Sequence, residues 1–390
     1  MRVLWLASWY PDKESPTNGD FVQRHARAVA ASQPITVIHV VQGDPRRAQR
    51  HDDTVVNEQG GLREVIVHFA YRPTGILPID KVRYEWKYRR ALDKAIDEEI
   101  ETHGRPDLVH VHVPMKAGHG ALRLKRRYGV PYIVSEQSSE YVEASPDSYW
   151  KRTKRYQRLV AQIFREAALV TNVSLTVAET LKKIAGRNDV IQVPNTVDTG
   201  LFRCDEGWPD PFRFIHVSNL NDQKNISGLL RTFTAFAEER SDWELVLVGP
   251  TGNHLDPLLK PLKDKVMVRC TGLLPYNEVA RELRRSSAFV LFSTHENFPC
   301  VIVEALCCGL PVITSTAGGS GDAIDKSNGE VVAPGDEEAL LAALRRMRGG
   351  YMVHDRGAIA RDAVSKYSYA VVGEMFRKAY QEVLSERLSS

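Results

Sequence analysis

Short apolar runs alternate with longer amphipathic stretches along the whole chain. A first series of runs lies at residues 3–7, 35–41, 65–69, 108–113, 132–134, 169–173 and 190–193. A second series lies at residues 212–217, 245–248, 266–269, 288–292 and 311–314. Between the runs, helical spacing of apolar residues is found at 21–31, 81–101, 229–239, 277–285 and 337–348. Runs that are apolar almost throughout, alternating with helices, predict parallel α/β sheets covered on both faces.

The two series indicate two domains. Pro209 and Pro211 interrupt regular structure between them, and a chain of 390 residues exceeds the usual size of one domain. We expect an N-terminal domain over residues 1–204, a C-terminal domain over 205–368 and a closing amphipathic helix over 369–390. Ligands of such sheets bind outside the carboxyl ends of the strands, so we expect the site in a cleft between the domains.

The segment from His295 to Pro311 carries the strongest chemical signal. It follows an apolar run, and Pro299 suits the first turn of a helix that Gly309 would end. The backbone N–H groups at the start of this helix would form an anion site fit for a diphosphate. Glu296 in the loop and Glu304 in the helix would place two carboxylates beside it, where they could accept hydrogen bonds from hydroxyl groups.

Other cofactor signatures are missing from the sequence. No GxGxxG fingerprint follows a predicted strand and no GxxxxGK[ST] sequence occurs, which disfavours a dinucleotide-dependent oxidoreductase. Paired aspartates with the spacing of a magnesium or manganese site are also missing, and we predict no metal. The five cysteines form no CxxC pair, so we expect free and mostly buried thiols at Cys204, Cys270, Cys300, Cys307 and Cys308.

Positive charge is concentrated in the first half of the chain. The net charge is +3, but residues 1–203 carry 31 Lys and Arg against 24 Asp and Glu, a net of +7. Basic clusters occur at Arg46, Arg47 and Arg50, at Lys87, Arg89 and Arg90, at Lys125, Arg126 and Arg127, and at Lys151, Arg152, Lys154 and Arg155. Solvated helix faces or attraction to an anionic membrane or acceptor would explain them. They lack the interleaved aromatic residues of a nucleic-acid site, so no nucleic-acid partner is expected.

The motifs together resemble those of glycosyltransferase family four, the retaining enzymes of GT-B fold also called glycosyl transferases group 1. Glu296 and Glu304 with Asn297-Phe298-Pro299 between them are similar to that family's signature. The likeness continues through Gly19, Asp107 to His112, Pro194-Asn195-Thr196-Val197-Asp198, Val217 to Asn225 and Gly318-Gly319. It implies two Rossmann-like domains that face each other across a cleft.

The resemblance also implies roles for individual residues. Glu296 would contact the donor sugar, Glu304 would hold the ribose and Lys224 would neutralise the leaving diphosphate. Further donor contacts would come from Gly19, Asn219, Asn297, Phe298, Pro299, Cys300 and Val301. The co-substrate would be a UDP- or GDP-linked sugar, with no other cofactor.

The chain departs from the family pattern at two positions. Asn219 stands where the family often has Arg, so one cation for the leaving group would be missing or supplied elsewhere. Gln137 stands where a His is common, and an amide cannot act as acid or base near neutral pH. Glu136 and Gln137 are acceptor-side candidates. We expect His112 to be catalytic, with His110 and Glu140 as further candidates to compensate.

The predicted reaction is sugar transfer with retention, by front-face attack on an oxocarbenium-like transition state and without metal. The acceptor would be a hydroxyl of a lipid-linked or polysaccharide-precursor glycan. Alternatives are a GT-B epimerase or phosphorylase, and a protein of this fold that binds sugar nucleotides without turnover. No apolar run reaches the length of a membrane span, so we expect a cytoplasmic protein with peripheral contact to the inner membrane face.

Overall fold

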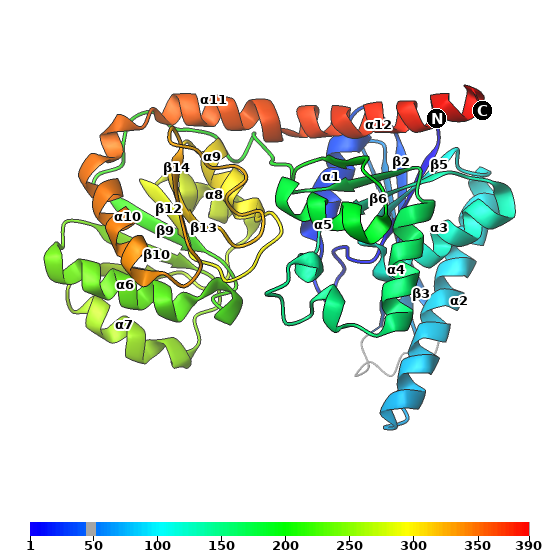
Figure 1. Cartoon of the computed structure of the whole chain (residues 1–390), viewed down its shortest axis with the longest axis horizontal. Helices are drawn as coiled ribbons and strands as arrows, with labels where there is room; N and C mark the ends of the chain where they lie inside the picture. The colour runs from blue at the N-terminus through cyan, green and yellow to red at the C-terminus, as the bar shows by residue number, and fades with distance from the viewer. Residues whose placement is uncertain (44–51, 390) are drawn as a thin grey trace.

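Two open sheets organise the chain, and each series of apolar runs supplies all the strands of one sheet except one (Figure 1). The computed structural model describes residues 1–43 and 52–389. The basic cluster at Arg46, Arg47 and Arg50 therefore lies outside the described residues.

The first sheet has eight strands within the described residues, in the order β3-β4-β2-β1-β5-β6-β7-β8. Its strands are β1 Val3–Ala7, β2 Ile35–Gln42, β3 Asp53–Gln59, β4 Leu62–Phe69, β5 Leu108–His112, β6 Tyr132–Glu136, β7 Leu169–Asn172 and β8 Val190–Gln192. Every neighbouring pair is parallel except β3 and β4. The parallel arrangement confirms what the continuous apolar runs predict.

The antiparallel edge strand β3 was not predicted. Its side chains are almost all exposed and its sequence is polar, so it lacks the apolar signal of the buried strands. Gly60 and Gly61 join it to β4, and both have positive φ. Such a pair suits a tight hairpin turn, which explains the antiparallel pairing.

The second sheet has six parallel strands within the described residues, in the order β11-β10-β9-β12-β13-β14. Its strands are β9 Arg213–Val217, β10 Glu244–Val248, β11 Met267–Cys270, β12 Ala288–Leu291, β13 Val312–Ser315 and β14 Gly329–Val332. The central strands β9 and β12 are neighbours in space though far apart in sequence. The strand order therefore reverses beside β12, which is where ligands of doubly wound sheets bind.

Helices cover both faces of each sheet (Figure 1). Those of the first half are α1 Asp20–Ala30, α2 Leu77–His103, α3 Pro114–Tyr128, α4 Lys154–Glu166 and α5 Leu175–Ala185. Those of the second half are α6 Ile226–Glu239, α7 Asp256–Lys263, α8 Tyr276–Arg284, α9 Cys300–Cys307, α10 Glu337–Gly350, α11 Arg356–Tyr367 and α12 Tyr369–Ser389.

The chain passes between the sheets twice, and the two crossings touch. Val197 pairs with Ser368 in a short parallel bridge, and the Thr196 hydroxyl donates to the carbonyl of Tyr367 at 3.0 Å. Thr196 thus uses its side chain to join the two crossings. Val197 and Phe202 pack in the core of the second sheet, although both precede residue 205.

The last helix, α12, packs against the first sheet and not the second. Phe376 and Tyr380 are buried in the same core as Trp5 of β1, and α12 lies along α1 (Figure 1). Gly373 faces the backbone of Ala28 so closely that any side chain there would overlap it. The end of the chain therefore fastens the two halves together.

Candidate functional site

The loop of residues 292–299 and the start of α9 form the centre of the candidate site. The loop leaves the carboxyl end of β12, next to β9, and α9 begins at Cys300. Pro299 precedes the helix as its N-cap, so its predicted place in the first turn is wrong by one residue. The first N–H groups of any helix have no partner within the helix, so this end can receive an anion.

Glu296 lies in the middle of this loop, and its carboxylate is paired with a cation. Its carboxylate accepts from the Lys224 ammonium and, at 2.8 Å, from the Ser293 hydroxyl. The side chain of Glu296 is 9% exposed and that of Lys224 is 16% exposed. Lys224 comes from the short turn after β9 that precedes α6, so the two predicted residues meet although they are far apart in sequence.

Gly318 fixes the position of the Glu296 backbone. Its φ is +63°, in the left-handed region, and a methyl group there would overlap the carbonyl oxygen of Glu296. Gly319 approaches the Asn297 carbonyl and the Ser174 side chain in the same way. This close packing requires glycine and holds the loop against its neighbours.

Asn297 and its neighbours connect the two halves of the molecule. The Asn297 amide accepts from the Ser174 hydroxyl at 2.8 Å and donates to the Ser138 carbonyl at 3.0 Å. The Phe298 carbonyl accepts from the Asn195 amide at 2.6 Å, while the Phe298 ring is buried in the second core. The side chains of Asn297 and Phe298 and the Phe298 carbonyl are thus engaged within the protein, which leaves the backbone N–H groups of these residues for a ligand.

Glu304 is buried and ion-paired across the domain boundary. Its carboxylate accepts from Arg24 of α1, and from the Tyr276 hydroxyl at 3.1 Å. Burial raises the pKa of Glu304, and the Arg24 charge opposes that shift. Glu304, the second predicted carboxylate, therefore lies at the site on α9. In this structure it is already paired with the Arg24 guanidinium.

The remaining predicted donor residues differ in their surroundings. Asn219 is exposed, and Cys300 and Val301 are half-buried at the start of α9. Gly19 has a positive φ, and a side chain there would overlap the backbone of Trp9. Packing inside the first domain therefore already accounts for glycine at this position, and its predicted contact with phosphate stays a prediction.

The acceptor-side residues form a buried chain of hydrogen bonds. The Gln137 amide donates to His25 Nδ1 at 2.7 Å, and its oxygen lies 3.3 Å from His112 Nδ1. His25 Nε2 lies 3.0 Å from the Pro194 carbonyl, which makes it a donor and fixes the tautomer. Gln137 thus uses its amide to bridge two histidines.

The histidines beneath the cleft are neutral. Burial lowers the pKa of His25 to about 4 and holds those of His110 and His112 well below the usual value. His112 stacks on Trp5 with ring centroids 4.0 Å apart, and its Nε2 has no hydrogen-bond partner among the described residues. Its surroundings suit a residue that positions Gln137 better than one that meets a substrate.

Glu136 is a second buried carboxylate on this side. It accepts from the backbone N–H groups of Gln137 at 2.8 Å and Ser138 at 2.7 Å. Burial raises the pKa of Glu136 to about 7, and these two hydrogen bonds limit the rise. Glu140, in the same loop, is instead bound by Arg152 and Tyr156.

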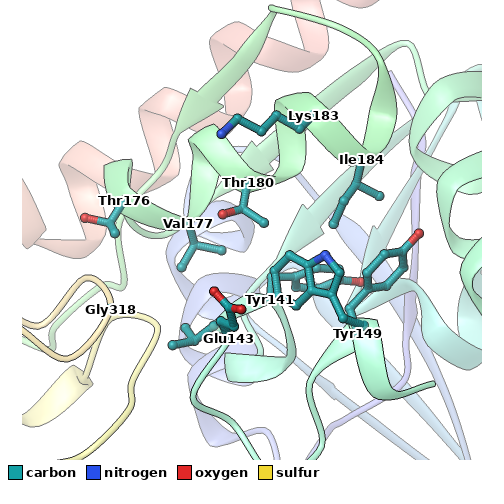
Figure 2. Close-up of a pocket in the computed structure, with 11 residues that line it drawn as sticks. Tyr141, Glu143, Tyr149, Thr176, Val177, Thr180, Lys183, Ile184 and Gly318 are labelled. Carbon is teal, nitrogen blue, oxygen red and sulfur yellow. The ribbon is translucent and has the colours of Figure 1, made fainter.

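Two cavities lie beside these residues. One of about 530 Å³ separates the two halves and takes its walls from both, among them Trp9, Ser138, Arg152, Gln223 and His295. A second, of about 590 Å³, lies between α5 and the loop of residues 141–150 (Figure 2). Tyr141 and Tyr149 form one wall of it, Thr180 and Lys183 the other, and Gly318 closes it on the side of the second domain.

Several residues at the interface were not predicted. Arg24 and Tyr276 meet Glu304, and Asp322 of the second half accepts from the backbone N–H of Leu175 at 2.8 Å at the start of α5. Asp322 also accepts from the Thr176 hydroxyl at 2.8 Å. A charged residue on the apolar face of α1 was the signal for Arg24, because Val22, His25 and Ala26 around it are buried.

Comparison with known proteins identifies the family. Residues 20–201 match the model named Glycosyltransferase Family 4, and residues 202–355 match the model named Glycosyl transferases group 1. The chain belongs to this glycosyltransferase family. These matches confirm the predicted family. The chain is therefore a glycosyltransferase that uses a nucleotide sugar.

One relative is similar over most of the chain and another over a shorter part of it. TuaC of Bacillus subtilis (strain 168), named as a glycosyltransferase of teichuronic acid biosynthesis, is 24% identical over 364 residues, which cover 89% of each chain. A glycogen synthase of Mycobacterium tuberculosis (strain H37Rv) is 26% identical over 252 residues, which cover 62% of this glycosyltransferase and 60% of the synthase.

Solved structures confirm the GT-B fold. Sucrose-phosphate synthase from Thermosynechococcus elongatus superposes with a TM-score of 0.77 at 18% identity, covering 99% of this chain and 100% of that one. Anabaena HepE in complex with UDP superposes with a TM-score of 0.72 at 16% identity, covering 98% and 100%.

Two further observations bear on partners. Within residues 1–43 and 52–389, no group of three or more His, Cys, Asp or Glu side chains is placed to hold a metal ion. No helix in the described part of the chain is long and apolar enough to cross a membrane.

Proposed function

We propose that this glycosyltransferase moves a sugar from a UDP- or GDP-linked donor to a hydroxyl of a lipid-linked or polysaccharide-precursor glycan, with retention at the anomeric carbon. The observation that carries the proposal is the Lys224–Glu296 pair at the start of α9. It sets a cation for the diphosphate and a carboxylate for sugar hydroxyls side by side, next to free helix amides.

The proposed donor site uses both glutamates. The diphosphate would lie at the N–H groups of Cys300 and Val301, with Lys224 beside it. Glu296 would bind the sugar and Glu304 the ribose. Because both carboxylates are buried and ion-paired in this structure, the domains must part to admit the donor, and the donor hydroxyls must replace protein hydrogen bonds.

The proposed transfer needs no metal. The bond from the anomeric carbon to the diphosphate oxygen breaks, and a bond to the acceptor oxygen forms on the same face. The acceptor proton passes to the departing diphosphate. Lys224 and the amides of α9 stabilise the negative charge that grows on the leaving group, and closure of the cleft excludes water.

The acceptor would approach from the first domain. The cavity of about 590 Å³ offers aromatic rings for a sugar face and hydroxyls and a lysine for its substituents (Figure 2). Gly318 lines this cavity and also touches Glu296. An acceptor held there would therefore lie close to the donor sugar. Gln137 and Glu136 would support the loop that forms one wall, and not act as acid or base on the acceptor.

A membrane-held acceptor is supported by the exposed start of α2. Ile79, Val82 and Trp86 are 47%, 68% and 57% exposed and share one helix face. Exposed Lys81 and Arg83 lie beside them, and this end of α2 extends beyond the body of the first domain (Figure 1). An apolar face with basic neighbours suits the surface of an anionic membrane, so we propose peripheral attachment at the inner face of the cell membrane.

A donor screen followed by a transfer assay tests the function. UDP-, GDP- and ADP-linked sugars are tested for a rise in melting temperature, since a ligand of the native state stabilises it by mass action. The donor that binds is then incubated with lipid-linked glycan extracts, and the product linkage is read by NMR. An inverted linkage would refute retention, an epimerised donor would indicate an epimerase, and binding without any turnover would indicate a binding protein.

A further inference from the structure

Arg24 is a buried arginine at the boundary between the domains. Its side chain is 7% exposed. One terminal nitrogen, Nη1, donates to Glu304 and, at 2.8 Å, to the Tyr276 hydroxyl, while Nη2 lies 3.0 Å from the Asp20 carboxylate. Its Nε is buried and has no hydrogen-bond partner among the described residues. The guanidinium thus enters the second domain with one donor unused.

The Arg24 guanidinium lies along the face of α9 that begins at the proposed diphosphate site. Glu304 and Cys300 are four residues apart, so their side chains share that face. Burial raises the pKa of the Cys300 thiol to about 12, and the Arg24 charge opposes the rise, because the two groups are close. The Arg24 charge therefore lies close to both Glu304 and the side chain of Cys300, the first residue of α9.

Donor binding would deprive Arg24 of its partner. If the ribose hydroxyls take Glu304, Nη1 loses its carboxylate, and Arg24 keeps only the half-exposed Asp20 as a paired anion. A buried guanidinium that loses its buried carboxylate is strongly destabilised. The diphosphate is the anion that arrives in the same step. Asn219 is exposed and carries no charge, so it cannot pair with the diphosphate as a cation. From the turn after β9, the second domain contributes the positive charge of Lys224.

We propose that Arg24 exchanges partners on donor binding: it gives up Glu304 to the ribose and binds the diphosphate, supplying the cation that Asn219 cannot. This inference rests on the proposed function. The planar guanidinium can bind two phosphate oxygens at once. Because Arg24 belongs to α1 and Lys224 to the second domain, the diphosphate would join the two domains as the cleft closes.

The test compares ligands that differ only in the diphosphate. The wild type is titrated with UDP, GDP and ADP, and the nucleotide that binds is compared with its nucleoside. In Arg24→Gln, we expect the nucleoside diphosphate to bind roughly 10- to 100-fold more weakly, as for loss of a charge-assisted pair. The nucleoside should bind at least as well as before, because taking Glu304 no longer strands a buried charge. Adding Asn219→Arg to this variant should restore most of the lost affinity.

Controls separate this role from a structural one. Arg123→Gln removes another ion-paired arginine, which contacts Asp93 and Asp97 within the first domain, and should leave both affinities unchanged. Arg24→Lys keeps the charge and serves if Arg24→Gln fails to fold; it should weaken the diphosphate less.

Three results would overturn the inference. Equal weakening of nucleoside and diphosphate would mean that Arg24 only holds the domains together. Tighter binding of both would mean that it is a latch on Glu304. No rescue by Asn219→Arg would deny that the two positions serve one ligand. A wild type that binds no nucleoside diphosphate would instead remove the proposed function, and this inference with it.

Discussion

At the scale of residues, the site is a set of charges that already have partners. Lys224 with Glu296, and Arg24 with Glu304, are buried pairs on either side of the start of α9. Breaking such a pair leaves a buried charge uncompensated, which is costly. A ligand that replaces one partner with its own hydroxyls or phosphate oxygens avoids that cost. We therefore propose that substrate recognition here is an exchange of partners and not the filling of an empty pocket.

Removing a charge from either pair should impair transfer. Lys224→Ala and Glu304→Ala should each lower kcat/KM by roughly 10²-fold, the scale of a lost transition-state donor, as measured by release of nucleoside diphosphate. Lys265→Ala removes an exposed lysine that pairs with Glu238 and should behave as the wild type. Full activity in both site variants would refute the site.

Glu136 should make stability depend on pH. Its pKa is raised from 4.5 to about 7 by folding, so its contribution is complete below about pH 4.5 and is lost as the pH rises to about 7. The loss is about 3 kcal/mol, from 1.36 kcal/mol per pKa unit. When the pH is raised from 5 to 8, the free energy of unfolding should therefore fall less in Glu136→Gln than in the wild type, as measured by urea unfolding. The exposed Glu143→Gln should keep the wild-type slope, and an unchanged slope in Glu136→Gln would contradict the assignment.

At the scale of elements, close backbone packing holds the donor loop. Gly318→Ala would drive a methyl group into the Glu296 carbonyl. Gly335 has a similar positive φ, but a side chain there would meet open space. Gly335→Ala therefore carries the same backbone strain without the collision.

The two glycine variants should differ in activity more than in stability. We expect Gly318→Ala to lower transfer at least 10-fold by moving Glu296, since small displacements of catalytic groups are costly. Gly335→Ala should keep its activity. Equal rates in the two purified variants would show that the packing at Gly318 does not position the loop.

The exposed start of α2 should bind anionic membranes. Wild-type protein should co-sediment with phosphatidylglycerol vesicles and less with phosphatidylcholine vesicles. The triple change Ile79→Ser, Val82→Ser and Trp86→Ser should weaken this binding by about 10-fold or more, because apolar burial and headgroup attraction act together. Met352 and Val353 are exposed apolar residues of the second domain. Changing these two to Ser should have no effect, and equal loss in both variants would refute the role of α2.

At the scale of the whole molecule, α12 and the contact between the two crossings hold the two domains together. The helix starts where the second domain ends and packs in the core of the first. If the domains move, we expect the pivot at the contact of Thr196 and Val197 with Tyr367 and Ser368, where the two crossings meet. Figure 1 shows α11 and α12 running along one side of the molecule, α11 over the second domain and α12 over the first.

Packing of α12 should contribute to the stability of the first domain. Gly373→Ala would push the helix away from Ala28, at a cost of about 1–3 kcal/mol for overpacking. The melting temperature should fall by several degrees. Gly349 also lies in a helix, but a side chain there would meet nothing. Gly349→Ala should be neutral or slightly stabilising, and equal melting temperatures would show that α12 is loosely held.

The sequence by itself determined the two parallel sheets and the donor loop. Continuous apolar runs and helical spacing are local patterns, and they placed the strand, loop and helix around Glu296 and Glu304 correctly. The edge strands β3 and β14 were not predicted. The strand β3 is polar and exposed, and β14 is a run of four residues that begins with Gly329 and Glu330, so neither has the continuous apolar signal of a buried strand.

Only the tertiary structure decided which charges meet. The contacts of Arg24 with Glu304 and of Asn297 with Ser174 join residues far apart in the chain, and no local pattern records such a pairing. It also placed His112 beneath Gln137, stacked on Trp5. Burial and partner choice arise from how two independently predictable domains pack together, and that packing is set by the whole surface of each.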